Sequence, residues 1–275
     1  MEAPIAVVTG ASRGAGKGIA LALGQAGMTV YVTGRSQAAG DSEYGGTIAE
    51  TARLVDEAGG RGIAVRVDHG DDAQVAGLFE RIKREHGRLD LLVNNAAHAL
   101  FSTDNFWDRP LETADLITVG LRSHYVASYY AVPLLIANGR GLIVNTGHYG
   151  AVSYHLGPAY GAQKAGADKM AGDMAKELRP FGVAAVSIWM GGLDTERVRA
   201  TLSGEALEGR ETPQFTGRVI AALYAAPNLL EYSGRTMIGA ELGAELGVTD
   251  VDGSAPASAR DRLGAPREPH PSLMA

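Results

Sequence analysis

Tyr160 and Lys164 are the residues whose types and spacing point most directly to chemistry. They are four positions apart, so on an α-helix their side chains would lie on the same face, one turn apart. A phenol beside an ammonium group can move a proton, because the positive charge favours the phenolate form of a group with a free pKa of about 10. The alternative is structural, with the Tyr packed on a helix and the Lys extended along its rim.

A glycine-rich segment near the N-terminus could hold a cofactor. It runs from Thr9 to Gly16, between an expected strand at residues 5–9 and a helical pattern at residues 16–26. Glycines at such a turn leave room for a pyrophosphate against backbone amides at the helix N-terminus. An ordinary glycine-rich turn would have the same spacing. The residues predicted to bind a dinucleotide here are Gly10, Ser12, Arg13, Gly14 and Gly16. Together with the Tyr and Lys, they predict hydride transfer.

The end of the second expected strand bears on which nicotinamide cofactor is bound. NAD enzymes usually place a carboxylate there to hold the adenosine ribose, whereas this sequence has Gly34 followed by Arg35. Arg35 and Arg13 are planar, bidentate donors suited to a 2′-phosphate, so we predict NADP(H) rather than NAD(H). Either arginine could instead be a solvated surface charge.

Polar residues also follow the third and fourth expected strands, at residues 63–67 and 89–94. Asp68 follows the first of these, and Asn95 follows the second. At the carboxyl ends of parallel strands, Asp68 could hydrogen-bond adenine and Asn95 could hold loop backbone around the adenosine. The alternative for each is that it only caps a turn, and this alternative is weaker for Asn95 than for Asp68.

The elements that must position these residues alternate between strand and helix. This alternation, with many Ala, Gly and Val residues, predicts an α/β fold: a single-domain, Rossmann-like, doubly wound parallel sheet with helices on both faces. The glycine-rich residues 38–46 and the long connection 97–110 would lie over the strand ends where ligands bind. The other expected strands are residues 29–33, 141–146 and 183–189, and the other expected helices are residues 47–58, from 71 onward, 114–136 and 159–179.

Composition limits the domain count and the class of partner. The chain of 275 residues is 45% hydrophobic, enough for one sizeable core, and we place one domain with its substrate pocket in residues 1–251. Residues 252–275 are rich in Pro, Ala, Ser and Arg without periodicity and predict a mobile tail. A net charge of −6 does not favour binding to nucleic acid. No apolar stretch approaches membrane-spanning length, and we expect no signal peptide at the N-terminus. Without Cys there is no disulfide or thiolate metal site, so we expect a cytoplasmic protein with no metal.

The ordered combination of the glycine turn, Asn94-Asn95-Ala96 and Tyr160-x-x-x-Lys164 resembles the short-chain dehydrogenase/reductase family over about residues 4–250. Further segments, at residues 33–35, 120–125, 141–144 and 250–253, resemble one branch of it. The resemblance implies that Tyr160 is the general acid that protonates a carbonyl oxygen, and that Lys164 also holds the nicotinamide ribose. Thr195 would bind the nicotinamide carboxamide, or only cap a helix from residue 196.

The chain departs from the family pattern most clearly at Gly147. The family usually has a Ser thirteen positions before the Tyr, where its hydroxyl holds the substrate oxygen. Losing such a donor commonly costs about a hundredfold to a thousandfold in rate. His148 is our first choice as a replacement because imidazole can donate, although the sequence alone favours a plain loop histidine. Other candidates are Thr146, Tyr149, Tyr154 and His155.

Two more positions differ from the family. Gly120 replaces an Asn that is associated with a kinked helix and a water relay to the lysine. Its main-chain carbonyl could preserve the relay, or the glycine could serve close packing against a neighbouring helix. Met190 replaces a Pro and adds a flexible apolar wall.

These residues together predict an NADPH-dependent oxidoreductase of the carbonyl reductase or alcohol dehydrogenase type. It would transfer hydride to a small apolar carbonyl substrate, or from the matching alcohol, with Tyr160 as general acid/base. Alternatives are reduction of an activated double bond, a noncatalytic NADPH-binding sensor or partner protein, and a scaffold without cofactor. The resemblance implies a homodimer or homotetramer formed through the helices at residues 114–136 and 159–179. Several residues could line an apolar cleft, or could instead close the core or an interface: Phe101, Phe106, Trp107, Tyr149, Tyr154 and Met190.

Overall fold

One parallel sheet forms the centre of the molecule. The computed structural model describes residues 2–98, 102 and 104–274. The sheet has seven strands in the order β3-β2-β1-β4-β5-β6-β7, with parallel pairing throughout. The Rossmann-like, doubly wound sheet predicted from the alternation is confirmed. The strands are β1 (Ile5–Val8), β2 (Thr29–Gly34), β3 (Arg61–Arg66), β4 (Leu91–Asn94), β5 (Gly141–Gly147), β6 (Val183–Trp189) and β7 (Thr236–Ile238).

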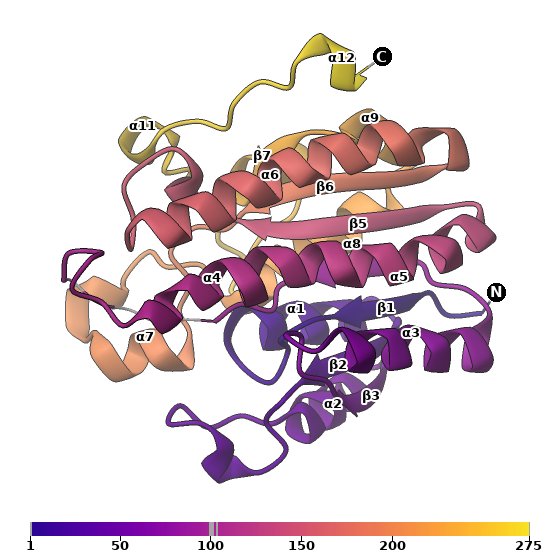
Figure 1. Ribbon diagram of the computed structural model, residues 1–275, viewed down its shortest axis with the longest axis horizontal. Coiled ribbons are helices and arrows are strands. Elements are labelled where there is room, and N and C mark those ends of the chain that lie inside the picture. Colours follow the sequence, from indigo (N-terminus) through magenta and orange to yellow (C-terminus); the bar gives the residue numbers. More distant parts are fainter. Residues whose placement is uncertain (1, 99–101, 103, 275) are drawn as a thin grey trace.

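Helices cover both faces of this sheet, and Figure 1 shows α3, α5 and α6 in front of it, with α1 and α8 behind. The burial of β1 explains why its sequence is a continuous apolar run. Ala6 and Val8 belong to the core under α1 and α8, whereas Ile5 and Val7 belong to the core under α3 and α5. A strand buried on both faces has no polar side to alternate with. The main helices are α1 (Gly14–Gln25), α2 (Ile48–Glu57), α3 (Asp72–His86), α5 (Ser123–Asn138), α6 (Pro158–Leu178) and α8 (Pro213–Ala225).

The helix expected over residues 114–136 is not continuous. It consists of α4 (Asp115–Ile117), a wide π turn (Thr118–Arg122) and then α5. Gly120 lies inside the π turn, which widens the helix locally, and the kink expected at this glycine stays a prediction. After β6 the chain adds elements that the sequence analysis did not identify. These are α8, α9 (Leu229–Tyr232), β7 and α10 (Gly239–Glu245).

The C-terminal tail runs across the outside of α6 (Figure 1). It contains two short helices, α11 (Arg260–Leu263) and α12 (Pro271–Met274). Arg260 pairs with Glu241, and Lys176 of α6 donates to the carbonyl of Ser272 at 2.6 Å. The mobility expected for residues 252–275 stays a prediction. Within the described residues, no helix combines the length and apolar character needed to cross a membrane.

Candidate active site

The glycine turn between β1 and α1 is closed so tightly that side chains do not fit. Gly10 has φ +65° and Gly14 has φ +57°, the left-handed region that favours glycine. A Cβ at Gly16 would lie 2.4 Å from the Gly10 carbonyl oxygen and 2.6 Å from Asn95 Nδ2. Asn95 in turn donates through Nδ2 to the carbonyls of Thr9, at 2.9 Å, and Gly10, at 3.1 Å. Asn95 thus fixes the glycine turn from the neighbouring strand end.

A single cleft of about 980 Å³ lies at the carboxyl ends of the strands. It lies on both sides of the switch point between β1 and β4, where ligands bind in open α/β sheets. Residues predicted to bind the cofactor and residues predicted to be catalytic line this same cleft. They are Gly10, Ser12, Arg13, Gly14, Gly16, Arg35, Asp68, Asn95, Tyr160, Lys164 and Thr195. The fold therefore brings together side chains that are far apart in sequence.

The two arginines predicted to bind a 2′-phosphate have different surroundings. The guanidinium of Arg13 donates to the Gly45 carbonyl and to Ser36 Oγ, both at 2.7 Å, and so holds the loop of residues 36–46. Arg35 is 63% exposed, and its Nη1 lies 3.9 Å from Asp68. Asp68 also accepts from the Gly70 amide at 2.9 Å, as its turn-capping interpretation requires. Arg35 therefore lines the cleft with no hydrogen bond to its guanidinium within the described residues, whereas the guanidinium of Arg13 is bonded to the loop.

Tyr160 and Lys164 lie one turn apart on α6 as predicted, with Lys164 Nζ 5.6 Å from the centre of the Tyr160 ring. Lys164 Nζ donates to the Thr146 carbonyl at 2.9 Å, and burial lowers its pKa to about 8, opposed by Asp168. Burial also raises the pKa of Tyr160 above its ordinary value. Desolvation is the cause of this increase, and the expected stabilisation of the phenolate by Lys164 stays a prediction. The side chain is kept as a phenol, which is the form that donates a proton.

The residues after β6 contact the glycine turn. Thr195 Oγ1 accepts from the Val198 amide at 3.3 Å, so Thr195 caps α7 (Glu196–Thr201), as one of its two interpretations predicted. Glu196 Oε2 accepts from the Gly14 amide at 2.9 Å, at the N-terminus of α1. A carboxylate bound at this helix end shows that the turn presents a donor to an anion.

The sequence matches the family model described as short chain dehydrogenase over residues 4–206. The protein belongs to the short-chain dehydrogenase/reductase family. It is 38% identical over 273 residues to dehydrogenase/reductase SDR family member 1 of Mus musculus and of Homo sapiens, covering 92% of this chain and 85% of each relative. The predicted branch of the family is thereby confirmed. A crystal structure from Xanthomonas campestris, provisionally named a dehydrogenase, superposes with a TM-score of 0.80 at 26% identity, covering 92% of this chain and 93% of that one.

In this member of the short-chain dehydrogenase/reductase family, Gly147 has no space for a side chain. Its Cβ would lie 2.4 Å from Trp189 Cδ1 and 2.8 Å from Ser187 Oγ. Trp189 is fully buried, and its Nε1 donates to Asp168 Oδ2 at 2.9 Å, while Ser187 Oγ donates to Asp168 Oδ1 at 2.5 Å. Burial raises the pKa of Asp168 to about 6, although both hydrogen bonds oppose the increase. The position of the expected hydroxyl is thus filled by an anchored indole.

Gly120 also has a packing role. A Cβ there would lie 2.4 Å from Gln163 Nε2, which donates to the Gly120 carbonyl at 3.1 Å. The close-packing interpretation of Gly120 therefore describes the structure, and the carbonyl expected to serve a water relay is already bonded to Gln163.

The residues expected to line an apolar cleft, or to close the core or an interface, have different surroundings. Met190 lines the cleft, but Tyr149 is in the core beside Trp189, with 5.2 Å between ring centres. Phe106 and Trp107 pack on each other at 5.1 Å and are mostly exposed, as is Tyr154. Phe101 lies outside the described residues.

Three residues that the sequence analysis missed shape the site: Asp168, Trp189 and Glu196. Asp168 could have been found, because it continues the helical spacing of Tyr160 and Lys164 by one more turn. The other two reach the site through contacts between distant parts of the chain.

Proposed function

We propose that the protein is an NADP(H)-dependent oxidoreductase that interconverts a small carbonyl compound and its alcohol. The observation that carries this proposal is the position of Tyr160 and Lys164 in the same cleft as the glycine turn. Its family membership supports the same reaction class. A 1-cyclohexenylcarbonyl-CoA reductase of Streptomyces collinus is also related, at 34% identity over 194 residues, which are 70% of this chain and 65% of that protein.

The cleft fits a dinucleotide. Its glycines allow close backbone approach, and the Gly14 amide already binds a carboxylate oxygen. The turn amides and Ser12 would hold the pyrophosphate, and Arg35 would hold the 2′-phosphate. Lys164 would hold the nicotinamide ribose, and Thr195 would hold the carboxamide. When bound, the nicotinamide supplies or accepts hydride at the substrate carbon.

Tyr160 supplies the proton in the reductive direction. Its O–H donates to the carbonyl oxygen, and the proton passes to that oxygen as the carbon gains hydride, so that the product is an alcohol. The Lys164 ammonium stabilises the phenolate that Tyr160 then becomes, until solvent returns a proton. In the oxidative direction the same phenolate is the base.

Arg35 is predicted to decide between the two nicotinamide cofactors. Arg35→Ala should weaken NADPH binding by about 10-fold to 100-fold, because charge-assisted hydrogen bonds to the 2′-phosphate are lost. NADH binding should change little. Dissociation constants measured by fluorescence titration test this, with Arg53→Ala on α2 as a surface-arginine control. Tighter binding of NADH than of NADPH by the unmodified protein would contradict NADP(H) specificity.

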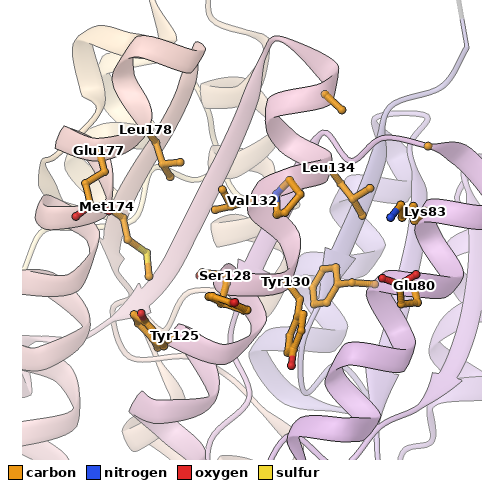
Figure 2. A pocket seen from close by; sticks show the side chains of 15 residues that line it. Glu80, Lys83, Tyr125, Ser128, Tyr130, Val132, Leu134, Met174, Glu177 and Leu178 are labelled. Atoms are coloured by element: carbon orange, nitrogen blue, oxygen red, sulfur yellow. The ribbon is translucent and has the colours of Figure 1, made fainter.

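We also propose a homodimer or homotetramer. An open groove of about 600 Å³ lies where α3, α5 and α6 meet. Figure 2 shows Tyr125 of α5, Met174 of α6 and Glu80 of α3 along it. Tyr125 and Tyr129 are 57% and 65% exposed. Exposed aromatic side chains that gather beside a groove are typical of a surface that binds a partner. Light scattering at micromolar concentration should give two or four times 28.6 kDa. A mass of one chain would rule this assembly out.

A further inference from the structure

The reaction proposed for Tyr160 requires a second hydrogen-bond donor. As hydride reaches a carbonyl carbon, negative charge develops on the oxygen, and one donor removed from such a site commonly costs about a hundredfold to a thousandfold in rate. Gly147 cannot supply that donor, because it has no side chain and Trp189 fills the space beside it. The question is which other N–H or O–H group near the Tyr160 ring is available.

Most of the neighbouring donors are already committed. Ser187 Oγ and Trp189 Nε1 both donate to Asp168. Lys164 Nζ donates to the Thr146 carbonyl. Tyr149 is 1% exposed, and its hydroxyl is held at the tail, where it accepts from the Ala259 amide at 3.0 Å.

Two histidines lie beside the Tyr160 ring. The ring centre of His148 is 5.7 Å from that of Tyr160, and the ring centre of His155 is 5.4 Å from it. The two imidazoles lie 4.6 Å apart, with His155 more exposed. Within the described residues, no hydrogen bond orients the His155 ring, whereas one orients the His148 ring.

The backbone fixes the tautomer of His148. Its Nδ1 accepts from the Gly150 amide at 2.9 Å, so in the neutral ring the proton is on Nε2. Nε2 donates to no described residue. It is also not one of the buried side-chain atoms that lack a hydrogen-bond partner. Burial lowers the pKa of His148 to about 3, with smaller contributions from His155 and Lys164, so the ring is neutral at physiological pH.

We propose that His148 Nε2–H is the second donor to the substrate oxygen, in the role that a hydroxyl at position 147 would otherwise have. The proposal rests on the proposed function, since it concerns the same reaction. Its own support is a ring held by the Gly150 amide, placed beside Tyr160 and left with one free N–H. A donor fixed before the substrate arrives stabilises developing charge without reorganisation.

A pair of substitutions separates this catalytic role from a structural one. His148→Asn keeps an oxygen that can accept from the Gly150 amide. Its shorter side chain places no donor where Nε2 lies in the histidine. His148→Gln reaches as far as Nε2 and can donate there. We expect His148→Asn to lower kcat by about a hundredfold or more and His148→Gln to retain most of it, with NADPH dissociation constants unchanged in both. His155→Leu, in the adjacent imidazole, should have little effect.

The outcomes are distinct. Full activity in His148→Asn, or a large loss in His155→Leu instead, overturns the role of His148 while leaving the proposed function intact. Absence of Tyr160-dependent turnover in the unmodified protein overturns both. Nitrogen-15 shifts of the histidines give a readout without substrate, and they should show His148 Nδ1 unprotonated near neutral pH. Protonation at Nδ1 instead would also overturn the proposal.

Discussion

Replacing Tyr160 by Phe should lower turnover by about a thousandfold while leaving NADPH binding unchanged. The phenyl ring fills nearly the same space but has no proton to give, and a positioned general acid contributes about 10²-fold to 10⁴-fold. Because Lys164 Nζ is held by the Thr146 carbonyl rather than by the phenol, the ammonium should stay in place in the variant. NADPH oxidation with aldehydes, ketones, diketones and quinones measures the effect.

Tyr154→Phe is the matched control for this experiment. It removes the same hydroxyl from a side chain that is 86% exposed and outside the cleft, so turnover should be unchanged. Tight NADPH binding with no turnover on any substrate, in the unmodified protein as in Tyr160→Phe, would favour the noncatalytic sensor or partner. Turnover only on compounds with an activated double bond would instead favour the alternative reductase.

Local sequence pattern was sufficient to predict the elements that build the cofactor site. The glycines of the turn between β1 and α1 lie within seven consecutive positions of the chain. Strands β1, β2 and β4 are mainly apolar because they are buried along their whole length. Parallel pairing then places every strand's carboxyl end at one edge of the sheet. This is why Asn95 and Arg35, which follow different strands, were predicted to lie at the same edge of the sheet.

The features that sequence analysis missed depend on register and on long-range packing. Gly147 of β5 and Trp189 of β6 are direct cross-strand partners, and the side chain of one fills the space left by the other. Periodicity indicates that both segments are strands, but it does not say which residues are paired. Glu196 contacts Gly14 across the cleft. Phe106 and Trp107 are exposed, because a loop has no periodicity that would fix which side chains face inward.

The pairing of Gly147 with Trp189 makes restoration of the family serine unfavourable. Gly147→Ser should destabilise the protein by about 1–3 kcal/mol, because the new Cβ would lie 2.4 Å from an indole that is fully buried and hydrogen-bonded to Asp168. The added hydroxyl should not raise kcat, since it enters space held by Trp189 rather than an open cleft. Urea midpoints, melting temperatures and kcat measure these effects.

Gly77→Ser is a suitable control for that substitution. Gly77 is on α3 with nothing within 4 Å of its would-be Cβ, and serine is a better helix former than glycine, so stability should be equal or slightly higher. A second comparison repeats Gly147→Ser in a Trp189→Phe background, where the smaller ring should reduce the cost. If the cost is the same in both backgrounds, the indole is not what excludes a side chain at position 147. A stable Gly147→Ser variant with raised kcat would mean that the backbone of β5 can shift enough to admit the hydroxyl, and that His148 has a substitute one residue away.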